Sequence, residues 1–172
     1  ALYSGIDKDA LRENLRYFLS RIMPVCEEHG INMCIHPDDP PCQVLGLPRI
    51  VTDTEDIQWL LNAVDNPHNG LTFCAGSLSS GKQNDVPAMA RQFASRTRFV
   101  HLRSTDILPG GDFIEASHLE GRGHLIELVK IFEQEDPSLP MRVDHGRLML
   151  DDADKGYNPG YSFHGRMYAL AQ

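Results

Sequence analysis

The sequence predicts an α/β fold in which parallel β-strands alternate with α-helices. Short strand-like runs, separated by segments with helical periodicity, occur at 31–35, 71–74, 98–102 and 141–144. Alternation on this scale is typical of parallel sheets with right-handed crossovers. A closed barrel of this type needs eight strands. The chain is therefore expected to supply about half of a (β/α)8 barrel.

Apolar periodicity and capping residues mark the expected helices. The first helix is expected from Asp7 or Lys8 to His29, because Asp7 can cap its start and Gly30 can close its end. The next helices are expected from Thr52 or Asp53 to about Val64, from Asn84 or Asp85 to about Ser95, and over 122–135. A final helix, introduced by Asn158-Pro159-Gly160-Tyr161, is expected to run towards Gln172. Small or polar residues dominate 75–81 and 104–117, which are expected to be loops. The second loop is long, which favours a functional role.

Composition narrows the class of protein. The chain has 172 residues, of which 41% are hydrophobic and 23% charged, as expected for a single globular domain spanning 1–172. A net charge of -8 argues against nucleic acid or an anionic membrane as a partner. No apolar run approaches the roughly 20 residues of a membrane span, and no signal peptide is evident. The four cysteines (Cys26, Cys34, Cys42 and Cys74) form no CxxC pair, which favours a reducing cytoplasm over a disulfide framework.

Residues that can bind a metal ion stand where the strand-like runs end. His36 follows the first run, and Cys74, His101 and Asp144 stand at the ends of the next three. The carboxyl ends of parallel strands share one edge of a sheet or one mouth of a barrel, so these side chains are expected to converge. Mixed nitrogen, sulfur and oxygen donors suit Mn²⁺, Fe²⁺, Co²⁺ or Zn²⁺ better than Mg²⁺ or Ca²⁺. Taken singly, each residue also has a structural explanation, such as a buried cysteine packing as a small apolar side chain.

Several longer sequence blocks contain these residues. They are His36-Pro37-Asp38-Asp39-Pro40-Pro41, Leu45-Gly46-Leu47-Pro48-Arg49-Ile50, Phe73-Cys74-Ala75-Gly76-Ser77, His101-Leu102-Arg103, Glu115-Ala116-Ser117-His118-Leu119-Glu120-Gly121, Asp144-His145-Gly146 and Asn158-Pro159-Gly160-Tyr161-Ser162. In content and order they resemble the mannonate dehydratase family. The resemblance covers only the C-terminal half of that family's length.

The resemblance implies a fold, a reaction and a set of site residues. The fold is a TIM barrel, and the activity is that of a cytoplasmic hydro-lyase of hexuronate (glucuronate) breakdown. It converts D-mannonate into 2-keto-3-deoxy-D-gluconate with loss of water. The residues that match the family's ligands for Mn²⁺ or Fe²⁺ are His36, Cys74, His101 and Asp144. His145 and Tyr161 match the family's acid/base pair, and the sequence leaves open which of them is the acid.

Further polar residues are candidates for binding substrate or for supporting the site. Arg103 could bind a substrate carboxylate or form an ion pair inside the barrel, and His118 could reach the site or brace its loop. Arg147 is a third candidate for substrate binding, although it stands where the resembling family varies. Asp38 and Asp39 are expected to hold loop amides or to orient His36.

Two alternatives to the dehydratase remain. One is a truncated, non-catalytic homologue that associates as a half-barrel, and the other is a metal-dependent sugar isomerase or epimerase with the same type of barrel. A half-barrel leaves two sheet edges unpaired. A homo-oligomer or a missing N-terminal half-barrel is therefore expected to complete the fold.

Overall fold

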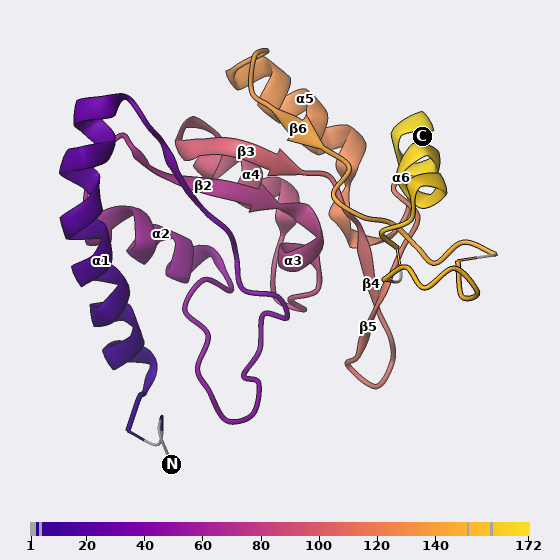
Figure 1. The fold of residues 1–172 in the computed structure, drawn as a ribbon, viewed down its shortest axis with the longest axis horizontal. Coiled ribbons are helices and arrows are strands. Elements are labelled where there is room, and N and C mark those ends of the chain that lie inside the picture. The colour runs from indigo at the N-terminus through magenta and orange to yellow at the C-terminus, as the bar shows by residue number, and fades with distance from the viewer. Residues whose placement is uncertain (1–2, 4, 151, 159) are drawn as a thin grey trace.

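A four-stranded parallel sheet forms the centre of the molecule (Figure 1). The computed structural model describes residues 3, 5–150, 152–158 and 160–172. The strands are β1 (Met33–Ile35), β2 (Asn69–Cys74), β3 (Thr97–His101) and β6 (Met141–Arg142), and they lie side by side in that order. All three neighbouring pairs are parallel, which confirms the predicted α/β class. In the register of the sheet Cys74 pairs with His101, so these two residues lie level at the carboxyl edge.

The long helices begin and end close to the predicted residues. They are α1 (Lys8–His29), α2 (Thr54–Ala63), α4 (Val86–Phe93), α5 (Leu125–Glu135) and α6 (Phe163–Ala171). Asp7, Asp53 and Asp85 each accept a hydrogen bond from a backbone N–H in the first turn of α1, α2 and α4. Gly30 ends α1 in the left-handed conformation, with φ 63°. Short 3-10 turns at Ala94–Arg96 and Gly121–Gly123 precede β3 and α5.

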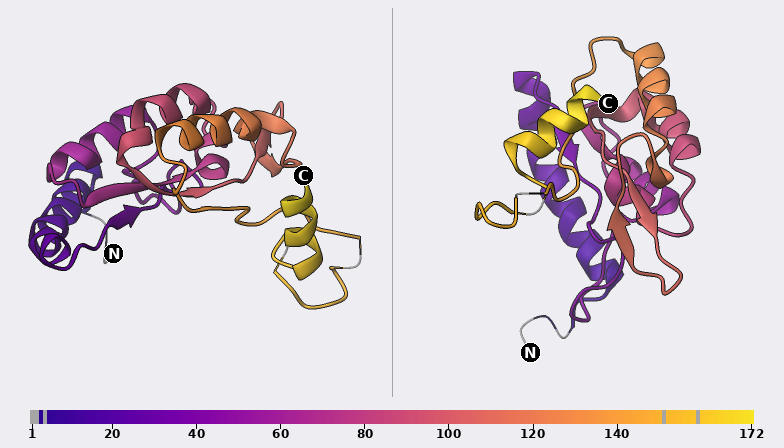
Figure 2. Two further views of the ribbon diagram at one scale, coloured as in Figure 1. Left: turned by 90° about the horizontal axis from the view of Figure 1, so that it is seen from above. Right: turned by 90° about the vertical axis from the view of Figure 1, so that its right-hand side faces the viewer.

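Helices α2, α4 and α5 cover one face of the curved sheet, and among the described residues no helix packs flat on the other face (Figure 2). The hydrophobic core lies between the sheet and these helices. Within it Phe73 of β2 meets Phe132 of α5 edge to face, with ring centroids 5.1 Å apart. Successive side chains of a strand point to opposite faces. Cys74, which follows Phe73, therefore points towards the uncovered face.

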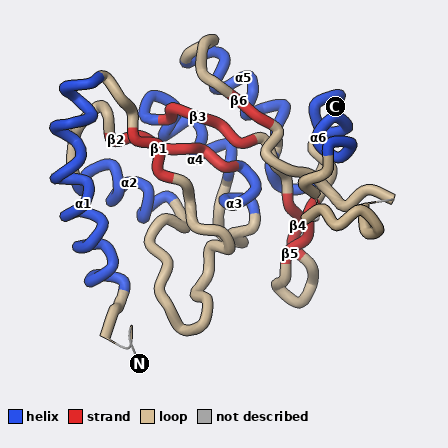
Figure 3. The backbone as a smooth tube through the Cα atoms, in the orientation of Figure 1, coloured by secondary structure: helices blue, strands red, loops and turns tan. Residues whose placement is uncertain are grey.

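Two segments that were expected to be loops contain regular structure. The segment 75–81 includes the short helix α3 (Ala75–Ser79), whose five residues are all buried. The segment 104–117 forms an antiparallel hairpin of β4 (Thr105–Ile107) and β5 (Phe113–Glu115), separate from the main sheet (Figure 3). The two elements support each other, since the hydroxyl oxygens of Ser79 and Thr105 lie 2.8 Å apart. Tertiary contacts of this kind stabilise elements whose local sequence is a weak signal.

The last strand of the sheet, β6, ends earlier than predicted. The strand expected at 141–144 ends at Arg142, and Asp144 has φ 51°, a conformation that residues other than glycine rarely adopt. The motif residue Pro159 lies outside the described residues.

All four cysteines are free thiols, in keeping with the prediction of no disulfide framework. Among the described residues, no helix combines the length and apolar character needed to cross a membrane.

Candidate metal centre and active site

Three of the predicted ligands meet at the carboxyl edge of the sheet. His36, Cys74 and His101 each offer one ligand atom, and these atoms all lie within 4.8 Å of one another. His36 Nε2 and His101 Nδ1 are 3.3 Å apart. The three residues follow or end the neighbouring strands β1, β2 and β3, so the parallel order of the sheet brings them together. The convergence predicted for these three side chains is confirmed.

The loop after β1 orients His36. Nδ1 of its ring lies 2.6 Å from the carbonyl oxygen of Pro37, which leaves Nε2 as the nitrogen that faces His101. The carboxylate of Asp38 accepts hydrogen bonds of 2.8 and 2.9 Å from the backbone N–H groups of Ile50 and Val51. Asp38 therefore holds loop amides, one of its two expected roles.

The electrostatics of the cluster favour a thiolate. Burial raises the pKa of the Cys74 thiol, but hydrogen bonds with His101 and His36 outweigh burial and lower this pKa to about 6. The same hydrogen bond to Cys74 is the main reason that the pKa of His36 is raised. Metal ions bind the deprotonated forms of cysteine and histidine. A buried thiolate between two imidazoles is thus a donor set that fits a borderline transition ion.

Asp144 lies beside this group but outside the set of mutually close ligand atoms. Its Oδ2 is 3.8 Å from His101 Nδ1 and 3.8 Å from His145 Nε2. Its Oδ1 accepts a 3.0 Å hydrogen bond from Arg142. The structure therefore places the carboxylate next to the His–Cys–His cluster, and ligation by Asp144 stays a prediction.

The two residues of the expected acid/base pair are in contact. The rings of His145 and Tyr161 are stacked, with centroids 4.6 Å apart and planes inclined by 26°. Nδ1 of His145 is buried and has no hydrogen-bond partner among the described residues. Burial raises the pKa of Tyr161, and the negative charge of Asp144 raises it further.

Glycine makes the contact between the His145 and Tyr161 turns possible. The N–H of Gly146 donates a 3.1 Å hydrogen bond to the carbonyl oxygen of Gly160. Gly160 has φ 79°, and a Cβ atom there would lie 2.0 Å from the carbonyl oxygen of Gly146. Any other residue at Gly160 would push the two turns apart, and with them the imidazole and the phenol.

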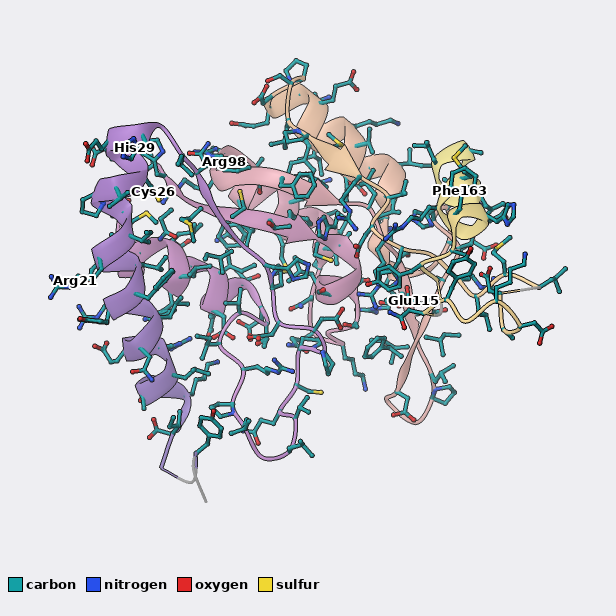
Figure 4. The ribbon with its side chains drawn as sticks, viewed as in Figure 1. Arg21, Cys26, His29, Arg98, Glu115 and Phe163 are labelled. Carbon is teal, nitrogen blue, oxygen red and sulfur yellow. The ribbon has the colours of Figure 1, made fainter. Side chains whose placement is uncertain are left out.

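The three candidate substrate-binding residues are placed differently. Arg103 is buried and forms ion pairs of 2.5 Å with both Asp39 and Glu115, so the ion-pair alternative is present in the structure. Figure 4 labels Glu115 at the end of the hairpin. His118 is buried, and its Nε2 lies 3.2 Å from the carbonyl oxygen of Val143, which braces the segment leading to Asp144. Arg147 is exposed. Substrate binding by any of these residues stays a prediction.

Sequence reasoning missed Ser77, whose hydroxyl lies 3.2 Å from Cys74 Sγ. The available signal was the spacing of three residues from Cys74, which places two side chains on the same face of a helix. The small residues of 75–81 predict a loop, and in a loop this spacing carries no such meaning.

Comparison with known proteins gives a consistent result. A family model described as D-mannonate dehydratase (UxuA) matches residues 1–172. A mannonate dehydratase of Marinomonas sp. (strain MWYL1) is 48% identical over 180 residues, which cover 99% of this chain and 46% of the relative. Mannonate dehydratase 2 of Agrobacterium fabrum (strain C58 / ATCC 33970) is 43% identical over 181 residues, covering 100% of this chain and 46% of the relative.

Solved structures agree. The crystal structure of mannonate dehydratase from Streptococcus suis serotype2 matches with a TM-score of 0.87 and 37% identity, covering 98% of this chain and 49% of that one. The IOLI protein with a binding zinc atom matches with a TM-score of 0.56 at 14% identity, covering 80% of this chain and 48% of that one, which is a likeness of fold alone. The chain spans about half the length of the curated relatives it matches, and it belongs to the D-mannonate dehydratase (UxuA) family.

Proposed function

We propose that this chain supplies the metal centre and the acid/base pair of a mannonate dehydratase, which converts D-mannonate into 2-keto-3-deoxy-D-gluconate and water. The observation that carries the proposal is the convergence of His36, Cys74 and His101 beside the stacked pair of His145 and Tyr161. Membership of the family supports the choice of reaction. The setting we propose is cytoplasmic breakdown of hexuronates.

The ion we propose is Mn²⁺ or Fe²⁺, held by His36, Cys74, His101 and, as a fourth ligand, Asp144. Other divalent transition ions, such as Co²⁺ and Zn²⁺, suit the same donors. When bound, a divalent ion supplies positive charge that stabilises the negative charge developing on the substrate carboxylate, an effect of several kcal/mol. The position of Asp144 Oδ2, 3.8 Å from His101 Nδ1, supports a place for the carboxylate in or next to this set.

The reaction needs one base and one acid. The base removes the proton from C2, beside the carboxylate, and the acid protonates the hydroxyl that leaves C3 as water. The resulting enol then tautomerises to the 2-keto product. The raised pKa of Tyr161 keeps its phenol protonated near neutral pH, so we assign Tyr161 as the acid. We assign His145 as the base, since its buried Nδ1 has no other described partner. Each proton transfer of this kind typically contributes about 10²–10⁴-fold.

A second half-barrel is part of the proposal. Strands β1 and β6 stand at the two edges of the four-stranded sheet. A sheet edge presents unpaired N–H and C=O groups that favour pairing with a further strand. We propose that the remainder of a longer protein, or a second copy of the chain, supplies the strands that close the barrel and complete the walls of the substrate site.

The test is product analysis on purified protein loaded with Mn²⁺ and supplied with D-mannonate. Both the 172-residue chain and an assembly that restores the barrel are assayed by mass spectrometry, with His145→Asn as the inactive control. The expected product of the assembly is one water lighter than the substrate. A product of unchanged mass would point instead to a sugar isomerase or epimerase. An assembly that binds metal but yields no product would favour a non-catalytic homologue.

A further inference from the structure

Ser77 occupies an unusual position beside the proposed sulfur ligand. It lies on α3, three residues after Cys74, and its side chain is completely buried. Its Oγ is 3.2 Å from Cys74 Sγ and 3.3 Å from Asp39 Oδ2. A serine hydroxyl has a single proton, so it can donate to only one of these two acceptors at a time.

Arg103 affects which of the two acceptors, Asp39 Oδ2 or Cys74 Sγ, receives the Ser77 proton. Its Nη1 donates a charge-assisted hydrogen bond of 2.5 Å to Asp39 Oδ2, the same oxygen that faces Ser77. Glu115 holds the opposite side of the guanidinium, with its carboxylate oxygens 3.0 Å from Nε. The guanidinium offsets the negative charge of Asp39 Oδ2, so this oxygen competes less strongly with the sulfur for the Ser77 proton.

The backbone at Gly76 fixes this arrangement. A Cβ atom at Gly76 would lie 2.3 Å from Cδ of Arg103, so the absence of a side chain lets the arginine lie directly against α3. The guanidinium, the Asp39 carboxylate and the Ser77 hydroxyl therefore stand in a fixed order that ends at the Cys74 sulfur. A buried hydroxyl held in this way is unlike a surface serine, which can rotate freely towards water.

We propose that Ser77 is a positioning residue for the Cys74 ligand, and that the Arg103–Asp39 ion pair directs its hydroxyl proton to the sulfur. A hydrogen bond to a thiolate fixes the direction of the sulfur lone pairs and reduces the electron density that the sulfur gives to an ion. The inference rests on the proposed metal centre, because it concerns how one of its ligands is held.

The test uses Co²⁺ as the probe, because a cobalt–thiolate bond gives a charge-transfer band in the near ultraviolet. The 172-residue chain is titrated with Co²⁺ at neutral pH as wild type, Ser77→Ala and Ser79→Ala. Ser79 is the matched control, since it is equally buried on α3 but bonds to Thr105 and not to the sulfur. Circular dichroism checks that each variant is folded.

Ser77→Ala is expected to bind Co²⁺ about tenfold more weakly, because loss of the hydroxyl that orients the sulfur outweighs the gain in its donor strength; tenfold is the lower end of the usual range for residues that support a metal ligand. Its charge-transfer band is expected to move to longer wavelength, because the sulfur becomes a stronger electron donor. Ser79→Ala is expected to match the wild type in both respects. Equal affinity and an unchanged band in Ser77→Ala would overturn the proposal.

A double-mutant cycle tests the part assigned to Arg103. Arg103→Met is expected to shift the band in the same direction as Ser77→Ala, because Asp39 then competes for the hydroxyl proton. The double variant is expected to bind Co²⁺ no more weakly than Ser77→Ala alone. Fully additive losses of Co²⁺ affinity would contradict the coupling between Arg103 and Ser77. Should Arg103→Met fail to fold, the comparison of Ser77→Ala with Ser79→Ala decides the role of Ser77 by itself.

The outcomes separate this inference from the metal centre itself. A wild-type chain without a thiolate band, or a Cys74→Ser variant that keeps the band, would overturn the metal centre and the role of Ser77 together. A wild-type band that depends on Cys74 but is indifferent to Ser77→Ala would remove the role of Ser77 alone.

Discussion

Replacing Asp56 with asparagine is expected to destabilise the chain by about 2–4 kcal/mol at neutral pH. Asp56 lies in the first turn of α2, and its side chain is 1% exposed. Its carboxylate accepts hydrogen bonds from Arg12 at 2.5 Å and from the hydroxyl of Thr52 at 2.7 Å, and Lys8 lies 2.6 Å away. The carboxylate thus joins the start of α1 to the start of α2.

The magnitude follows from these contacts. A hydrogen bond to a charged group contributes about 1.5–3 kcal/mol, and loss of one partner of a fully buried ion pair costs about 3–5 kcal/mol. The side chains of Arg12 and Lys8 are 21% and 44% exposed, so water can partly solvate them once the carboxylate is lost. The cost is therefore expected to stay below the upper end of the range for a fully buried ion pair. An asparagine keeps one acceptor oxygen but turns an NH₂ group towards donors.

The pH dependence has a definite sign. Burial raises the pKa of Asp56, but hydrogen bonds from Lys8 and Thr52 outweigh burial and hold this pKa below its ordinary value of 3.8. A carboxyl group whose pKa is lowered by folding stabilises the folded state above the unfolded pKa of about 4. That contribution disappears as the pH falls through the folded pKa.

Urea denaturation followed by circular dichroism, from neutral pH down to acid, measures both effects. Asp56→Asn is expected to be less stable than the wild type at neutral pH, and the difference is expected to narrow in acid. Asp65→Asn is the control, because Asp65 is 87% exposed and its ion pair with Arg96 is long, at 3.5 Å. This control is expected to lose less than about 1 kcal/mol. An Asp56→Asn difference near zero, or one that does not change with pH, would refute the reasoning.

The remaining predictions concern the metal centre and the reaction. Cys74→Ser is expected to weaken binding of Mn²⁺ or Co²⁺ far more than replacement of Cys26 or of either exposed cysteine; equal metal retention in all four variants would make Cys74 structural. His145→Asn and Tyr161→Phe are each expected to keep bound metal and lose most turnover of mannonate in an assembly that restores the barrel, and unchanged rates in either would remove that residue from the reaction. The 172-residue chain alone is expected to be far less active than that assembly, since displacement of about 1 Å can already cost about a hundredfold. Full activity in a verified monomer would contradict this last expectation.

Much of the architecture could be predicted because it depends on local signals. Capping by Asp7 and closure by Gly30 define α1 from the sequence alone. The alternation of strands and helices implies parallel pairing, and parallel pairing implies that residues ending neighbouring strands meet. That reasoning suffices to predict that His36, Cys74 and His101 meet, as they do in the structure.

The features that the sequence did not predict depend on contacts between distant residues and not on local signals. Helix α3 has five residues, and each strand of the β4–β5 hairpin has three. Elements this short do not show a recognisable hydrophobic periodicity. Both depend on contacts with distant parts of the chain. The ion pair of Arg103 with Asp39 joins residues 64 positions apart, and no local pattern reports such a pairing. The left-handed backbone at Asp144 is likewise absent from any local sequence pattern, because residues other than glycine rarely adopt it.

The central claim is that His36, Cys74 and His101 together bind one transition-metal ion. X-ray absorption spectroscopy of the Zn²⁺-loaded 172-residue chain tests it directly, because it reports the atoms bound to the ion. The predicted spectrum contains one sulfur at about 2.3 Å and nitrogen or oxygen ligands at about 2.0–2.1 Å, with the sulfur missing in Cys74→Ser. A wild-type spectrum with only oxygen and nitrogen ligands would contradict the claim.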